Sequence, residues 1–289
     1  MATGTGSPAV KDWTHKYHAE ALAVEGHLRL PIKQPIERQA HAKVRETGGY
    51  ESQESKAFRV EGLLSYTAAT TQVSGHEEDK HGRPWITLST SVIEKLNVLN
   101  VITADRIVAQ ISTEHPRDGY VPTVTFLGTQ FDNLRIGGKP IDVDLDLDLG
   151  EHPGKDTAFT RHPGFRNRVI ERLGIVRAQA DLPEDVKKRY SEDIRPMENG
   201  ECTEYSLVRK ITGTFPGKSF GHVLDIPHFG KVYLAVVRIE HCDPTKGKDL
   251  HKQTLIHLTM LDIQMGCIAS GSVQCASTKT NGGSVPPTG

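Results

Sequence analysis

Hydrophobic and polar residues alternate along most of this chain, in short runs that Gly, Pro and charged residues interrupt. The alternation has the period of a β-strand, in which successive side chains point to opposite faces of a sheet. Val, Ile and Thr are dense over 89–112, and such residues suit the half-buried surface of a sheet. The pattern predicts strands in the following segments: 18–31, 57–66, 89–112, 123–143, 205–212, 222–227, 230–240 and 253–264.

The clearest turn signal is the pair Gly137 and Gly138, because glycine adopts the positive φ of a tight hairpin at little cost. Directly after it, aspartate and aliphatic residues alternate from Ile141 to Leu149. In a strand this spacing sends all the aspartates to one face and all the aliphatic residues to the other.

Three interpretations of the aspartates are a metal site, a catalytic pair and the solvated face of a sheet. Neighbouring acids on one strand face lie about 6.8 Å apart, whereas a calcium loop curls to bring its oxygen ligands together. The spacing therefore favours a solvated face, neutralised by Lys or Arg on adjacent strands. We expect burial of the aliphatic residues and exposure of the acids, which are Val143, Leu145, Leu147 and Leu149 and Asp142, Asp144, Asp146 and Asp148.

The pattern changes between residues 150 and 201, where Pro, Gly, His and charged residues precede two helical segments, 165–173 and 182–191. We interpret 150–201 as a partly helical insertion between strands, whose arginines can carry partner contacts: Arg166, Arg168, Arg172 and Arg177. The predicted fold is a mostly antiparallel β-sandwich or flattened barrel. It divides into a β domain at 1–149 and 202–276, the insertion, and a disordered tail at 277–289 that is poor in hydrophobic residues.

Charge and composition narrow the possible partners. The chain of 289 residues carries 35 Lys and Arg against 36 Asp and Glu, a balance that gives no overall attraction to nucleic acid. We expect no membrane span, because no apolar run approaches the length of a transmembrane helix. The first residues lack the pattern of a secretory signal, which makes the cytoplasm the default location.

Cysteine and histidine are the candidates for chemistry. The cysteines are scattered without a C-x-x-C pair, which is typical of buried thiols and leaves pairing open: Cys202, Cys242, Cys267 and Cys275. His15 and His18 have H-x-x-H spacing but no following metalloprotease pattern. Other histidines lie in one strand-rich region and are the candidate metal ligands: His222, His228, His241 and His257.

The order of several motifs resembles the choice-of-anchor P family of bacterial β-rich surface proteins. The matching segments are 100–105, 133–143, 226–234, 254–261 and 268–276. The resemblance implies a β-rich protein at a bacterial surface, and it carries no catalytic residues to this chain.

No nucleophile elbow, Walker loop or dinucleotide fingerprint is present. The segment 213–219 resembles a phosphate loop only superficially, since the first glycine is not at the required offset. We expect a non-catalytic structural or binding protein without a cofactor that self-associates as a homo-oligomer through its strand edges, with no identified small-molecule partner. The alternative is a metal-dependent enzyme or small-molecule binder that uses the C-terminal histidines.

Overall fold

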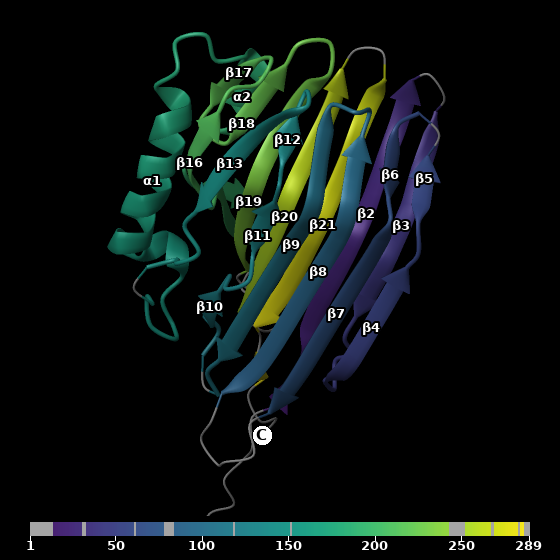
Figure 1. Cartoon of the computed structure of the whole chain (residues 1–289). Helices are drawn as coiled ribbons and strands as arrows, with labels where there is room; N and C mark the ends of the chain where they lie inside the picture. The colour runs from purple at the N-terminus through teal and green to yellow at the C-terminus, as the bar shows by residue number, and fades with distance from the viewer. Residues whose placement is uncertain are drawn as a thin grey trace, which may run out of the picture.

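The chain folds into two antiparallel β-sheets that pack face to face, as the computed structural model in Figure 1 shows. The structure describes residues 14–30, 33–60, 62–77, 84–117, 119–150, 152–242, 252–266, 269–282 and 284–285. The fold is therefore mainly β, and of the two predicted architectures it is the sandwich. No helix within these ranges is long and apolar enough to cross a bilayer.

The larger sheet has eleven strands among the described residues. Its main order is β16 (Val208–Gly213), β13 (Lys139–Leu145), β12 (Arg135–Ile136), β9 (Ile102–His115), β8 (Trp85–Val98), β6 (Leu64–Tyr66) and β5 (Phe58–Val60). β10 (Thr123–Thr125) and β11 (Gln130–Asp132) also pair with β9, whereas β7 (Ala68–Glu77) pairs with β8 and β4 (Gly49–Ser55) pairs with β7.

The smaller sheet has nine described strands. Its main order is β14 (Arg195–Met197), β15 (Gly200–Ser206), β19 (Gly230–Cys242), β20 (Gln253–Gly266), β21 (Ser270–Gly282), β2 (His18–Leu30) and β3 (Gln34–Lys43). β18 (Val223–Ile226) pairs with β19 and with β17 (Lys218–Phe220), and β1 (Thr14–His15) pairs separately with β22 (Ser284–Val285). The predicted disordered tail is wrong for residues 277–282, because they continue β21 between β2 and β20.

A line of unusual backbone conformations crosses the smaller sheet. Ala40, Ala235 and Ala276 have φ of 46°, 46° and 51°, and the strand registers place them in one row across the sheet. The side-chain alternation reverses at this row: in β20, Ile256 is buried before it and Ile263 after it, although the two are an odd number of positions apart. A regular alternation of inward and outward residues therefore predicts the wrong face for one half of each of these strands.

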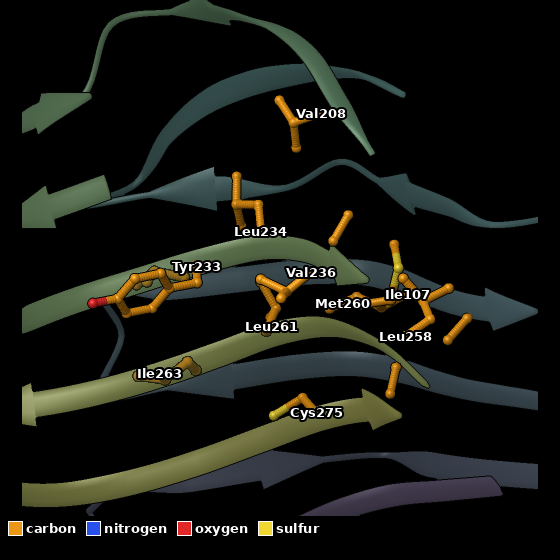
Figure 2. Packing of buried hydrophobic residues seen from close by; sticks show 14 of the residues in the cluster. Ile107, Val208, Tyr233, Leu234, Val236, Leu258, Met260, Leu261, Ile263 and Cys275 are labelled. Carbon is orange, nitrogen blue, oxygen red and sulfur yellow. The ribbon is translucent and has the colours of Figure 1, made fainter. Parts of the chain in front are cut away.

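The core differs between the two ends of the sandwich. At the end that contains the β8–β9 turn, large aliphatic and aromatic residues fill the space between the sheets, among them Leu96, Ile102 and Phe126. Figure 2 shows Ile107 of β9 beside Leu258 and Met260 of the smaller sheet. At the opposite end small residues are buried between the sheets, namely Ala19, Ala21, Thr87, Ser89, Ser91 and Thr278. Tyr17 and Trp85 are buried in a second, smaller cluster at this end.

Helices occur in the predicted insertion. α1 (Pro163–Arg177) buries Phe165, Val169, Leu173 and Val176 in the same core cluster as the sheets. α2 (Glu184–Arg189) lies against the outer side of the smaller sheet, and a short 3-10 helix, η1 (Phe159–Arg161), precedes α1. Both predicted helices are confirmed, and the division of the chain at 150 and 201 stays a prediction.

Arg189 holds α2 on the smaller sheet. Its guanidinium donates to Glu204 Oε1 at 2.6 Å and to Asp262 Oδ2 at 2.8 Å, and it lies 4.0 Å from the centre of the Tyr233 ring. All three charged side chains are largely buried. Opposite charges that leave water together in this way stabilise the docked helix only while both partners remain.

Candidate functional site

The four candidate histidines do not converge. His222 lies between β17 and β18, His241 ends β19 on its inner side, and His257 is on the outer side of β20. His228 is exposed in the β18–β19 turn, where its φ is 60°. Across the described part of the chain, no three His, Cys, Asp or Glu side chains form a group suited to a metal ion.

The three less exposed histidines are held separately by hydrogen bonds within the fold. His222 Nε2 lies 2.7 Å from Tyr190 Oη, and His257 Nε2 lies 2.6 Å from Ser277 Oγ. His241 Nε2 accepts from the Phe159 backbone N–H at 3.0 Å, so its proton is on Nδ1, which lies 3.1 Å from Thr254 Oγ1. These contacts account for the histidines as structural groups.

Burial keeps these imidazoles uncharged. It lowers the pKa of His222 to about 3, with a smaller contribution from Arg189. Burial likewise lowers the pKa of His241 and that of His257 to about 4, and Lys279 and Arg238 add to the effect at His257. All three are therefore neutral at physiological pH.

The aspartates after the Gly137–Gly138 turn are mostly solvated, as predicted. That turn has φ of 56° and 77°, which confirms the glycine hairpin. The exposed aspartates are Asp142, Asp144 and Asp148. Arg209 on the adjacent β16 lies 3.7 Å from Asp144, which is the neutralisation expected of a neighbouring strand.

The prediction that all four aspartates are exposed is wrong for Asp146. Its side chain is only 16% exposed and accepts from Arg172 at 2.7 Å and Arg168 at 3.2 Å, both on α1. The aliphatic set also departs from expectation, since Leu149 is buried but Val143, Leu145 and Leu147 are only partly buried. The reason is that β13 ends at Leu145, after a register shift, so the alternation continues beyond the strand.

Other candidates from the sequence are likewise structural. Arg177 donates to the Tyr190 backbone carbonyl at 2.6 Å and to Asp193 at 2.6 Å, so like Arg168 and Arg172 it serves the fold. Cys202 and Cys275 are buried thiols, and burial raises the pKa of Cys275 to about 12. Cys267 lies outside the described residues, so the question of its pairing stays open.

Two open hollows of about 500 Å³ each lie on the surface. One runs along the β5–β6 hairpin and is lined by Phe58, Val60 and Lys95 among others. The other separates β11 from β13 and is lined by Phe131 and Asp144 among others. Both are shallow, and neither gathers the histidines discussed above.

The outer side of the smaller sheet carries a row of charge. The registers align one titratable residue from each of six strands, in the order Lys43, Glu20, Lys279, His257, Arg238 and Glu204. Glu20 lies between Lys43 and Lys279, Glu204 lies beside Arg238, and the uncharged His257 separates Lys279 from Arg238; opposite charges on adjacent strands favour the sheet. This face therefore satisfies its own charges.

The outer side of the larger sheet is different. Its middle carries thirteen uncharged residues that are not buried, and we name them the uncharged face: Tyr50, Ser52, Thr70, Gln72, Ser74, Ile86, Leu88, Thr90, Val92, Gln110, Ser112, Thr125 and Gln130. Charged residues of the same side lie around its margin: Glu54, Glu94, Arg106, Glu114 and Asp132. In Figure 1, β7, β8 and β9 present this side with no helix across it.

β8 shows why this face is unusual. From Ile86 to Val92 its aliphatic side chains point outward, whereas Thr87, Ser89 and Ser91 point inward and are buried. Ser89 Oγ donates to the Glu20 backbone carbonyl at 2.8 Å and Ser91 Oγ to that of Leu22 at 2.9 Å, both in the opposite sheet. The strand is thus inverted relative to a normal amphipathic strand.

This face was not found from the sequence. The signal was present in the alternation of Ile, Leu and Val with Thr and Ser over 86–92. The alternation alone would assign the aliphatic residues to the core. The core side carries small hydroxyl residues because β2 of the opposite sheet lies close to β8.

These features define a mainly β sandwich protein whose distinctive surface is a sheet face. The family model described as "Domain of unknown function (DUF8256)" matches residues 15–240, and the chain belongs to this family. No curated protein and no solved structure matches the chain. The resemblance to the choice-of-anchor P family stays a prediction.

Proposed function

We propose that the chain is a non-catalytic structural or binding module that self-associates through the uncharged face. The observation that carries the proposal is the inverted strand β8, whose Leu88 and Val92 face solvent between uncharged neighbours on β7 and β9. The cores of protein interfaces are depleted of charge, because a buried charge must lose its water. A bacterial and surface-associated setting is part of this proposal through the choice-of-anchor P resemblance.

Three edge strands, β3, β14 and β16, are less suited to association than the face. β3 contains Pro35 and the positive φ of Ala40, β14 contains Pro196, and β16 presents Arg209 and Lys210. Proline, charge and irregular backbone on an edge strand all oppose pairing with another strand. We therefore assign association to the face of the sheet, in place of its edges.

Light scattering over a range of protein and salt concentrations tests the proposed function. The mass should rise from 31.8 kDa as the protein concentration increases, and the rise should persist in weakened form at high salt, because the centre of the contact is uncharged and only the ion pairs at its ends are screened. A mass of 31.8 kDa at every concentration would contradict self-association.

A further inference from the structure

We infer that the uncharged face packs against the same face of a second copy, around a twofold axis that runs across the strands at Thr90 and Gln110. This inference rests on the proposed self-association and adds the partner, the surface and the symmetry. Thr90 and Gln110 are register partners on β8 and β9, at the centre of the face, and Gln110 Nε2 donates to Thr90 Oγ1 at 3.2 Å.

The area of the face matches what a dimer needs. Five strand positions at about 4.8 Å spacing give a width of about 24 Å, and the eight steps from Ile86 to Glu94 give a length of about 27 Å. The product is roughly 650 Å² for each copy and about 1,300 Å² for a pair, which is within the usual range of specific interfaces.

A second copy is the occupant whose shape and chemistry the face fits. Sheets pack face to face at about 10 Å when their side chains are of moderate size, as in the sandwich itself. The central residues Leu88, Thr90 and Val92 are of this kind. In an isologous contact the same surface is used by both copies, so the aliphatic residues of each copy are covered by those of the other.

Charges at the two ends of the face select the axis. Arg106 and Glu114 lie on β9 at equal distances in sequence from Gln110, one toward each end. A twofold axis across the strands at Gln110 brings Glu114 of one copy over Arg106 of the other, twice in each dimer. An axis along β8 would place Arg106 opposite Ala68, its counterpart on β7, and make no ion pair.

Arg106 is suited to this role. Its side chain is 45% exposed and lies 3.3 Å from Glu94 within its own chain. Glu114 is exposed, and no ion pair is recorded for it among the described residues. In the dimer, Glu114 of the second copy would lie over Arg106, whose register neighbours in its own chain are Glu94 and Asp132, and Glu114 would gain a cation.

Leu88→Arg tests the surface. The new charge would be desolvated at the centre of the dimer, so sedimentation should show at least a tenfold weaker association than for the wild-type chain. Gln264→Arg on the outer side of β20 in the other sheet is the matched control and should leave the association unchanged. Thermal unfolding checks that both variants remain folded, and Thr90→Lys provides a second variant at the centre.

The outcomes separate the inference from the proposed function. A wild-type chain that never associates contradicts both. Association that survives Leu88→Arg and Thr90→Lys in folded protein contradicts this interface only, and self-association through another surface would then stand.

A charge exchange tests the axis. Arg106→Glu and Glu114→Arg should each weaken the dimer several-fold, because each places like charges across the interface. The double variant restores opposite charges and should recover most of the affinity. Single losses without recovery in the double variant, or no loss in either single variant, would overturn the axis.

Discussion

The two outer faces of the sandwich differ in how they satisfy their side chains. The face of the smaller sheet aligns acids and bases from strand to strand and receives α2 through Arg189. The face of the larger sheet presents thirteen uncharged residues, with aliphatic side chains of β8 among them. One face pairs most of its charges within the chain, whereas the other leaves aliphatic side chains at the surface.

The inner side of each sheet explains the contrast. The hydroxyl groups of Ser89 and Ser91 reach backbone carbonyls of β2, which requires small residues where the sheets approach closely. The aliphatic residues of the same strand are therefore left on the outside. The residue pattern of β8 therefore causes both the close approach of the two sheets and the apolar side chains on the outer surface.

The largest effect should come from breaking the charged face. Arg189→Met leaves Glu204 and Asp262 largely buried without their cation, and we expect a loss of about 3 to 5 kcal/mol in the free energy of unfolding. Arg38→Met removes the 55% exposed partner of Glu25 on the same sheet and should cost less than about 1 kcal/mol. Urea denaturation of both variants measures the difference, and equal losses would contradict the role given to Arg189.

The second largest loss of stability is expected for a change at Asp146. Asp146→Asn weakens the contacts to Arg168 and Arg172, and we expect a loss of about 1.5 to 3 kcal/mol in the free energy of unfolding. Asp142→Asn is the control, since Asp142 is exposed on the same strand. Chemical denaturation distinguishes the two positions. An Asp146→Asn variant as stable as the wild-type chain would show that the contacts of Asp146 with Arg168 and Arg172 do not stabilise the fold.

Acid should weaken the charged face through His257. Its pKa is about 4 in the fold against 6.5 in the unfolded chain, so the unfolded chain takes up the proton first as the pH falls. The stability that His257 contributes is present above pH 6.5 and is lost toward pH 4, by about 2 kcal/mol between pH 7 and pH 5. His257→Gln should reduce the measured loss by that amount, and an unchanged pH dependence would refute the assignment.

The smallest changes in stability should come from β8. In contrast to a normal amphipathic strand, replacing a small hydroxyl residue should cost more stability than replacing an aliphatic one. Ser91→Ala removes the buried hydrogen bond to Leu22 and should cost about 1 kcal/mol. Val92→Ser changes a residue on the outside and should cost less than about 0.5 kcal/mol in the monomer while it weakens association. Denaturation at low protein concentration gives the monomer values, and a larger loss for Val92→Ser would contradict the inverted strand.

Local signals in the sequence predicted part of this fold. The Gly137–Gly138 turn and the two helices are confirmed, because each depends on neighbouring residues. The turn between β8 and β9 was not foreseen, since Leu99 and Asn100 adopt positive φ without glycine. The reversed alternation at Ala235 and Ala276 was hidden for the same reason.

The uncharged face and the role of Asp146 depend on partners that are distant in sequence. Ser91 bonds to Leu22, and Asp146 pairs with residues of α1 that follow it by more than twenty positions. No local pattern specifies such contacts. The candidate histidines were identified by residue type, and the fold distributes them among separate hydrogen bonds.

Hydroxyl-radical footprinting at low and high protein concentration tests most directly whether a second copy covers the uncharged face. Oxidation of Tyr50, which is 63% exposed, and of Leu88 should fall several-fold as the dimer forms. Leu30 and Ile170, 55% and 43% exposed on the other sheet and on α1, should react equally at both concentrations. Unchanged oxidation of Tyr50 and Leu88 in a sample that sediments as a dimer would contradict the account.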